Sequence, residues 1–244
     1  MNSSDGGRFV IVRQRAGFMV KAFVTDNYSY IAKHGIGAAR ARCRPAFSRT
    51  SVDRLELRLA LFGFDGVFYT LTFDDDHEPP DWAGVKKAWE RFIKRLKRCR
   101  GSPLEYYVYR IEGLHGDHRW HIHVFLRQQD FPLPVVQQAW GDLGNVEAEC
   151  WTRARVLATA NVDYRGYRGL AQYISKEVPE VGRHAWGCSR ALSKFIRPPT
   201  VTVSRSGVIH PPPGAVPMLS DEKSRPVLGK WGVYGYSRYL LPEK

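Results

Sequence analysis

The stretch WHIHVFL, residues 120–126, is the clearest indication of this chain's fold. Side chains alternate across a β-strand, so His121 and His123 point to one face while Ile122 and Val124 point to the other. The apolar face can bury against a helix. The opposite face then carries two imidazoles side by side, which predicts a half-formed metal site on a strand of a sheet.

The neighbouring segments complete the expected architecture. A strand over 104–111 is joined to the histidine strand by the short polar link 113–118, so the two are expected to be antiparallel neighbours. A strand over 67–73 is rich in aromatic and β-branched residues. A long amphipathic helix follows it, with Asp81 as its N-cap and Gly101 at its end. The other expected elements are helices over 51–61, 134–140 and 166–178 and a strand over 150–157.

This order of elements predicts an α+β fold. We expect one antiparallel sheet with helices packed on one face and the histidine strand near its centre. Residues 1–50 read as a basic, irregular N-terminal arm, with an arginine cluster at Arg40, Arg42, Arg44 and Arg49. Residues 51–195 form the expected core domain. Residues 196–244 are rich in Pro and Gly and are expected to wrap around it as an irregular extension.

The composition favours a polyanionic partner. The net charge is +13, the pI is about 9.8, and the chain has 26 Arg against 11 Lys. Arginine suits phosphate groups and base stacking, which favours nucleic acid over a basic enzyme that binds none. The four cysteines form no C-x-x-C pair, and there is no apolar run of about 18 residues and no signal core. We therefore expect a soluble protein in a reducing cytoplasm, without membrane contact.

Glu112 is the candidate third member of the histidine site, because a short hairpin can return it beside His121. Two neutral imidazoles and a carboxylate make a mixed nitrogen and oxygen site that suits Mn²⁺ or Mg²⁺. The link that follows holds rival ligands, at His115, Asp117 and His118. The alternative is that the histidines are ordinary strand residues, hydrogen-bonded to their neighbours.

Tyr173 and Lys176 are three residues apart on the last predicted helix and therefore share a face. The adjacent stripe at Leu170, Ile174 and Val178 is expected to hold this helix on the sheet. A tyrosine presented in this way can attack phosphorus, and the lysine can stabilise charge on the phosphate or the phenolate. Packing and surface charge are the alternative roles of the pair.

Two further tyrosines, Tyr164 and Tyr167, are rival nucleophiles, although neither has a lysine three residues on. Thr70 and Thr72 share a face of the strand over 67–73. If that strand neighbours the histidine strand, their small side chains leave room for a metal and a phosphate; packing preference also explains them.

Three segments in this order resemble the motifs of HUH-superfamily rolling-circle replication initiators: FYTLTF over 68–73, HIH over 121–123 and YISK over 173–176. The similarity is closest to the replication-associated proteins of small bacterial plasmids and single-stranded DNA phages. It extends over about residues 50–195, and the segment 186–194 is similar to one that follows the tyrosine helix in some members.

The resemblance implies a ferredoxin- or RRM-like sheet and a nickase that cuts one strand at a single-stranded DNA origin in a bacterial cytoplasm. His121, His123 and Glu112 would hold Mg²⁺ or Mn²⁺, and Tyr173 would form a 5′-phosphotyrosine link that is later resolved to rejoin the strand. The candidate DNA contacts are Arg119, Arg165, Arg168, Thr70 and Thr72. Phage-type members often carry a second tyrosine on this helix, whereas Glu177 follows Lys176 here, so a single-tyrosine cycle is expected.

The sequence has no G-x-x-x-x-G-K-[ST] loop, so a host helicase is expected to unwind the duplex and a host DNA polymerase to extend the 3′ end. One alternative is a single-tyrosine HUH transposase, which uses the same chemistry on hairpin ends. A second is an RRM-like module that binds RNA or single-stranded DNA without catalysis, with Tyr107 and Tyr109 stacking on bases.

Overall fold

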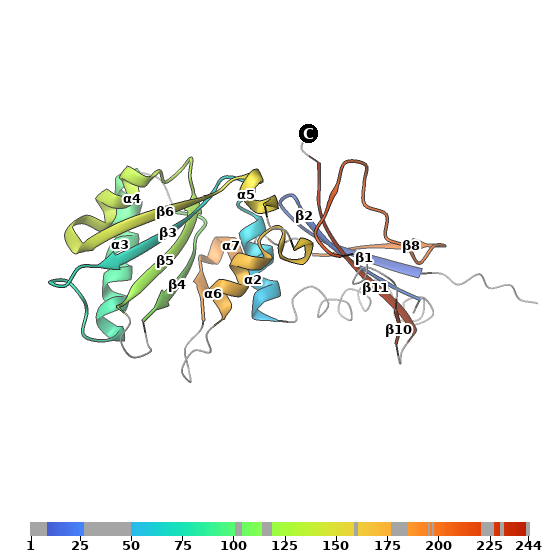
Figure 1. The fold of residues 1–244 in the computed structure, drawn as a ribbon, viewed down its shortest axis with the longest axis horizontal. Coiled ribbons are helices and arrows are strands. Elements are labelled where there is room, and N and C mark those ends of the chain that lie inside the picture. The colour runs from blue at the N-terminus through green and yellow to red at the C-terminus, as the bar shows by residue number, and fades with distance from the viewer. Residues whose placement is uncertain are drawn as a thin grey trace, which may run out of the picture. The chain divides into compact units, whose positions relative to one another are not determined.

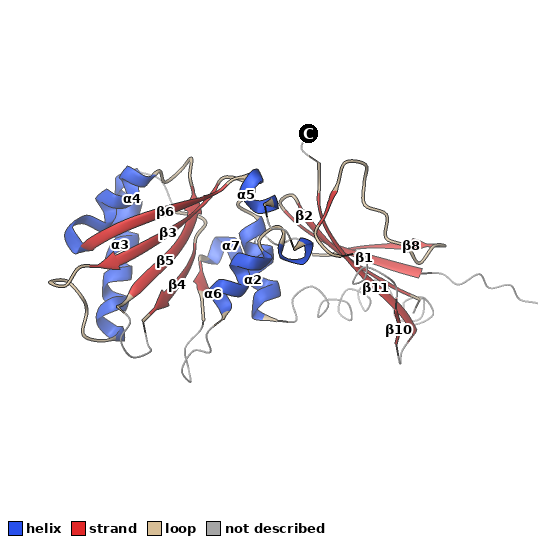
Figure 2. Cartoon of the chain, in the orientation of Figure 1, coloured by secondary structure: helices blue, strands red, loops and turns tan. Residues whose placement is uncertain are grey.

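A computed structural model of the chain describes residues 9–26, 50–100, 104–113, 119–158, 161–176, 185–194, 196, 198–220, 227–229 and 232–242. The chain divides into two compact units (Figure 1). Unit 1 is made of residues 1–61, 157–171 and 196–244, and unit 2 of residues 62–156 and 172–195. Helices and antiparallel strands occur together (Figure 2), which confirms the α+β class.

Unit 2 is built on a five-stranded antiparallel sheet. Its order is β6 (Gly144–Trp151), β3 (Gly66–Phe73), β5 (His121–Arg127), β4 (Val108–Glu112) and β7 (Gly187–Cys188). The histidine strand β5 lies at the centre, and β4 is its antiparallel neighbour, as predicted. β4 begins four residues later than expected, and the edge strand β7 was not predicted.

One close approach between β3 and β5 explains a glycine. A Cβ built at Gly66 would lie 2.1 Å from the Phe125 ring. Only glycine therefore leaves room for this ring, which packs edge-to-face on Phe62 with centroids 4.9 Å apart.

Helices α3 (Trp82–Arg100) and α4 (Leu133–Trp140) cover one face of this sheet. The predicted N-cap of α3 is confirmed, because the Asp81 carboxylate accepts a 2.8 Å hydrogen bond from the backbone N–H of Gly84. Alternate residues of β3 and β5 meet the two helices in one apolar core. Its buried members include Tyr69, Leu71, Phe73, Ile122, Val124, Val85, Trp89, Phe92, Leu96, Val136 and Trp140. The alternation leaves the histidines on the opposite face.

The end of α6 (Arg168–Ser175) packs on that opposite face, through residues 172–175 of unit 2. The segment 150–157 differs from its prediction: β6 ends at Trp151 and α5 (Arg153–Leu157) follows. Thr152 is the physical reason, because its hydroxyl accepts from the N–H of Arg155 at 3.3 Å and its carbonyl from Val156 at 2.9 Å. Unit 2 also contains α7 (Arg190–Lys194) and the 3₁₀ turn η1 (Gly141–Leu143).

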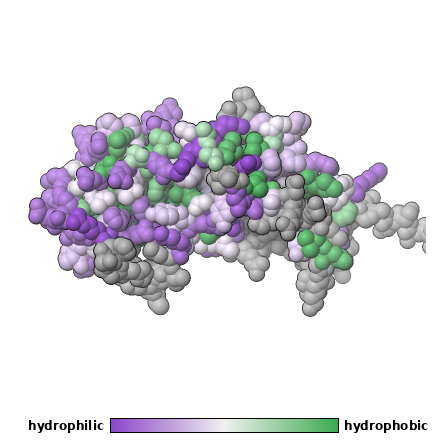
Figure 3. Space-filling model, viewed as in Figure 1, coloured by the Kyte–Doolittle hydropathy of each residue, from purple (hydrophilic) through white to green (hydrophobic). Residues whose placement is uncertain are grey.

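Unit 1 contains a second antiparallel sheet, in the order β10 (Val227–Gly229), β11 (Gly232–Leu240), β2 (Met19–Thr25), β1 (Phe9–Ala16) and β8 (Thr200–Ser204). β9 (Val216–Pro217) pairs with β11, and α2 (Ser51–Ala60) and the 3₁₀ turn η2 (Val162–Tyr164) complete the unit. The edge strand β10 exposes Val227 and Leu228, which give the apolar patch over this strand in Figure 3.

These strands correct the expectation that both terminal segments are irregular. Residues 9–25 form a hairpin because Val10 and Val12 are buried while Arg15 faces outward, and Gly17 turns the chain with φ 55°. Residues 200–240 supply its partners, with β8 on β1 and β11 on β2. The arginine cluster from Arg40 to Arg49 lies outside the described residues. In the part of the chain that the structure describes, no helix is long and apolar enough to cross a membrane.

Candidate active site on the histidine face of unit 2

The two histidines of β5 are held by two threonines of β3. Thr70 is the register partner of His123, and Thr72 is the partner of His121. The Thr70 Oγ1 lies 3.2 Å from the Nδ1 of His123, and the Thr72 Oγ1 lies 3.3 Å from the Nδ1 of His121. A hydroxyl can donate or accept, so each threonine can orient its imidazole in either tautomer. The threonines therefore orient the rings and direct both Nε2 atoms away from β3.

Glu112 reaches the same face from β4. Its backbone pairs with His121, as predicted, but its side chain turns to the other histidine: Glu112 Oε2 lies 2.9 Å from His123 Nε2. Two ligands at right angles, each about 2.1 Å from a divalent ion, are about 3 Å apart. The spacing of this carboxylate and imidazole therefore fits two adjacent ligands of one ion.

Arg110 was missed by sequence reasoning and joins the acid to the tyrosine helix. Only 2% of this residue is exposed. Its Nη2 lies 3.2 Å from Glu112 Oε1, and its Nη1 donates to the carbonyls of Tyr173 and Ile174 at 2.8 and 2.9 Å. The last carbonyls of a helix lack intrahelical donors and carry partial negative charge, so a guanidinium stabilises them. The available signal was a charged residue two positions before Glu112 and thus on the same strand face.

Tyr173 projects from α6 onto the histidine face. Its ring lies edge-on to the His123 ring, with centroids 5.9 Å apart, and 6.2 Å from the Phe68 ring. Phe68 in turn stacks on His123 at 5.0 Å. Tyr173 remains 40% exposed. An aromatic packing thus positions the phenol beside the Glu112–His123 pair without removing it from solvent.

Lys176 lies next to this tyrosine, as the i, i+3 spacing predicted. Its Nζ is 4.7 Å from the centre of the Tyr173 ring and 3.8 Å from Glu112 Oε1. The side chain is half exposed, so the ammonium can approach a bound phosphate while it remains near the phenol. The site therefore combines a nucleophile, a cation, a carboxylate and an imidazole.

The rival tyrosines belong to unit 1. Tyr167 is 2% exposed and is part of the apolar core, whereas Tyr164 is exposed. Of the three tyrosines considered, Tyr173 is the one that contacts His123.

The arginines proposed as DNA contacts are placed differently from one another. Arg119 is exposed and forms an ion pair with Asp75. Arg168 is largely buried in unit 1, where its Nη1 lies 2.5 Å from Asp53 Oδ1 and 3.4 Å from Glu56 Oε2. To contact DNA, Arg168 would have to leave both carboxylates, so the structure favours a structural role for it.

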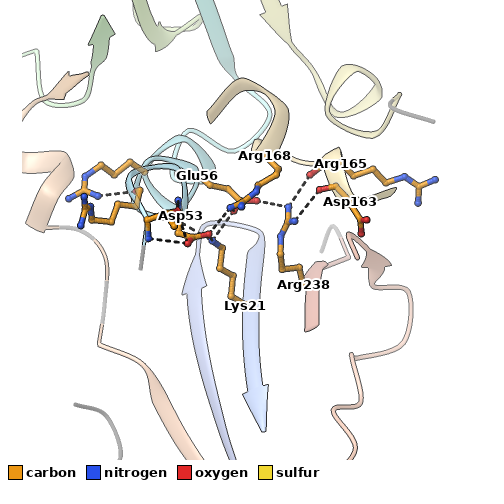
Figure 4. Close-up of polar contacts among 10 residues, drawn as sticks. Lys21, Asp53, Glu56, Asp163, Arg165, Arg168 and Arg238 are labelled. Atoms are coloured by element: carbon orange, nitrogen blue, oxygen red, sulfur yellow. Dashed lines mark hydrogen bonds and ion pairs between the residues drawn. The ribbon is translucent and has the colours of Figure 1, made fainter. Parts of the chain in front are cut away.

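Arg168 is part of a buried charge network that Figure 4 shows. Lys21 is fully buried and its Nζ lies 2.8 Å from Glu56 Oε2, while Arg238 Nη2 lies 2.5 Å from Glu56 Oε1. Arg238 also donates to the carbonyl of Arg165 at 3.3 Å, so the Arg165 backbone belongs to the same network.

The acid at the rim of this network is stabilised as a carboxylate. Burial raises the pKa of Asp53, but Lys21, a hydrogen bond from Thr50 and the contact with Arg168 lower it by more, so the pKa lies below its ordinary value of 3.8. The network therefore holds α2, β2, β11 and the start of α6 together inside unit 1.

The non-catalytic alternative required Tyr107 and Tyr109 to be exposed for base stacking. Both are packed on Trp89 of α3, with ring centroids 5.8 and 4.3 Å away. Burial raises the pKa of both phenols. These rings are part of the core side of the sheet, which argues against a stacking platform there.

The fit of the site to a metal ion is partial. In the described residues, no three His, Cys, Asp or Glu side chains are grouped so as to hold an ion. Glu112 and His123 form a suitable pair, while the His121 ring is 6.5 Å from that of His123 between centroids. The rival ligands His115, Asp117 and His118 lie outside the described residues. The donors are chemically suited to Mg²⁺ or Mn²⁺, and the carboxylate–imidazole pair is the part whose geometry fits.

Comparison with known proteins matches residues 66–178 to a family model that describes replication-associated proteins of the ORF2 type. The match supports a replication initiator. It spans somewhat less than half of the chain, begins at the first residue of β3, and includes Glu112, both histidines, Tyr173 and Lys176. Searches of curated proteins and of solved structures gave no match.

Proposed function

We propose that this chain cuts and rejoins one strand of DNA at a replication origin, through a covalent link to Tyr173, and so initiates rolling-circle replication. The observation that carries the proposal is the position of the exposed Tyr173 ring, edge-on to His123, whose Nε2 is 2.9 Å from Glu112. The resemblance to HUH replication initiators and the family match over 66–178 support the same chemistry.

The reaction exchanges one phosphodiester for another. Tyr173 Oη attacks the scissile phosphorus and forms a bond to the 5′ phosphate, while the bond from phosphorus to the 3′ oxygen breaks. The phenol proton is transferred overall to the departing oxygen, which becomes a free 3′ hydroxyl that can prime synthesis. Attack by a 3′ hydroxyl on the phosphotyrosine reverses these steps and rejoins the strand, so no external energy source is needed.

The remaining side chains position and neutralise. Lys176 lies between the phenol and Glu112 and can stabilise the charge that develops on the phosphate. Thr70 and Thr72 orient the imidazoles, and Arg110 holds the carbonyl end of α6 from which Tyr173 projects.

A divalent ion, Mg²⁺ or Mn²⁺, is the proposed cofactor. Glu112 and His123 would hold it together with His121, and when bound it would polarise the scissile phosphate. Single-stranded origin DNA is the proposed substrate, and a host helicase and a DNA polymerase are the proposed partners.

The test is to incubate the protein with single-stranded DNA and Mn²⁺ and to identify any adduct by mass spectrometry. We expect a DNA fragment on Tyr173, no adduct with Tyr173→Phe, and retained DNA binding in that variant. Tyr164→Phe is the matched control, because Tyr164 is an exposed tyrosine outside the site, and its adduct yield should equal that of the wild type. An adduct that persists in Tyr173→Phe would refute the assignment of the nucleophile.

A further inference from the structure

The outward side of α3 carries a dense row of positive charge that the proposed chemistry does not use. Its buried side is apolar and is part of the core of unit 2. Its exposed residues include a single acid, Glu90, and seven basic residues, which together form the basic face of α3: Lys86, Lys87, Arg91, Lys94, Arg95, Lys97 and Arg98.

This arrangement does not serve the stability of the helix. Lys87 and Arg91, Arg91 and Arg95, and Lys94 and Arg98 are like-charged pairs at i, i+4, which destabilise a helix. Among the residues that the structure describes, none of the seven forms an ion pair, so their charge is not neutralised from within. A surface that carries this repulsion is suited to a polyanion that relieves it.

The basic face is separate from the active site. α3 packs on the side of the sheet formed by Tyr69 and Leu71, whereas Thr70 and His123 point to the other side (Figure 1). A phosphate bound on the outer surface of α3 is therefore not the phosphate presented to Tyr173.

We propose that the basic face of α3 binds the phosphate backbone of double-stranded DNA, as a second and non-catalytic nucleic-acid surface. Surfaces for single strands combine basic groups with aromatic rings for base stacking. On α3 these rings turn away from solvent: Trp89 and Phe92 are buried, and Trp82 packs on Trp120 with centroids 6.2 Å apart. With charge but no stacking rings, the face suits a duplex, whose bases are already stacked.

The dimensions agree with this ligand. A helix of 19 residues is about 28 Å long, close to the roughly 34 Å of one turn of duplex DNA. Binding of this kind reads no sequence, so it would retain flanking duplex while the active site holds a single strand.

The experiment compares binding of a 20-base-pair duplex and of a 20-nucleotide single strand by fluorescence anisotropy over a range of salt concentrations. The α3 variant carries Lys87→Gln, Arg91→Gln, Lys94→Gln and Arg98→Gln; glutamine keeps the helix propensity, and all four sites are exposed. The control variant removes the same charge from exposed sites elsewhere, through Arg15→Gln, Arg54→Gln, Arg190→Gln and Arg205→Gln.

We expect the α3 variant to bind the duplex at least about 10-fold more weakly at moderate salt. The slope of log K against log salt should become shallower by about 0.9 for each phosphate that the variant no longer neutralises. The single strand should be affected much less, and the control variant should change duplex affinity by less than about 3-fold.

Equal losses of affinity in the two variants, an unchanged duplex affinity, or an equal loss for the single strand would each overturn the proposal. Adduct formation on a short single strand is expected to persist in the α3 variant. A wild type that forms no adduct but shows the α3-dependent duplex binding would refute the catalytic proposal alone.

Discussion

Replacing Arg110 by Met should strongly destabilise unit 2, because this residue is buried with its guanidinium fully engaged. It is 2% exposed and makes hydrogen bonds of 2.8 and 2.9 Å to two carbonyls of α6 and of 3.2 Å to Glu112. Hydrogen bonds to charged groups contribute about 1.5–3 kcal/mol each but are not additive. Removing one partner of a buried ion pair typically costs about 3–5 kcal/mol. We therefore expect the free energy of unfolding to fall by about 3–5 kcal/mol.

The measurement is urea unfolding followed by tryptophan fluorescence. Six of the seven tryptophans lie in the residue ranges of unit 2, so the signal reports mainly on this unit. Arg119→Met is the matched control: it removes an exposed arginine that is also paired with a carboxylate, and exposed pairs contribute about 0–1 kcal/mol. Arg110→Lys should fall between the two, because a lysine keeps the charge but lacks the planar fork that serves three acceptors.

The reasoning would be wrong if Arg110→Met and Arg119→Met lowered stability by the same amount. A loss of stability in Arg110→Met with unchanged cleavage of saturating single-stranded DNA would separate the two roles. It would show that Arg110 supports the sheet without positioning Tyr173.

Two further predictions concern the metal ligands and the charge network. Replacing both His121 and His123 by Ala should weaken Mn²⁺ binding by more than about 100-fold in isothermal titration calorimetry, since losing only a group that supports a ligand costs about 10–100-fold. Retained affinity would point to ligands in residues 114–118. Asp53 should stabilise unit 1 above pH 3.8, its ordinary pKa, because its pKa is lowered in the folded chain, and this contribution should disappear as the pH falls through the lowered value. The difference in unfolding free energy between the wild type and Asp53→Asn, followed by circular dichroism, should therefore shrink on acidification; a difference that grows would contradict the network.

The elements around the active site were predictable because their signals are local. The alternation of His121 and His123 with Ile122 and Val124 placed both imidazoles on one face, and the short link after β4 placed Glu112 beside them. The apolar stripe of α3 and its Asp81 cap are likewise contained in one short window.

The features that escaped prediction depend on residues far apart in the chain. β11 pairs with β2 across more than 200 residues, which no local periodicity can indicate. The role of Arg110 depends on carbonyls more than 60 residues later, so the chain around it reads as an ordinary strand. The helix α5 was misread because one hydroxyl, that of Thr152, turns an apparent strand into a helix start.

The way in which unit 1 is assembled has a consequence for biosynthesis. Its sheet joins β1 and β2, which are made early, to β8 and β11, which are made after all of unit 2. A ribosome that has released residues 62–195 has supplied the whole of unit 2. At that moment the hairpin of β1 and β2 still has both outer edges unpaired, and unpaired edges promote aggregation. A nascent chain that stalls before residue 200 would therefore carry a finished catalytic fold together with an adhesive hairpin, which makes the codons for residues 200–240 decisive for yield.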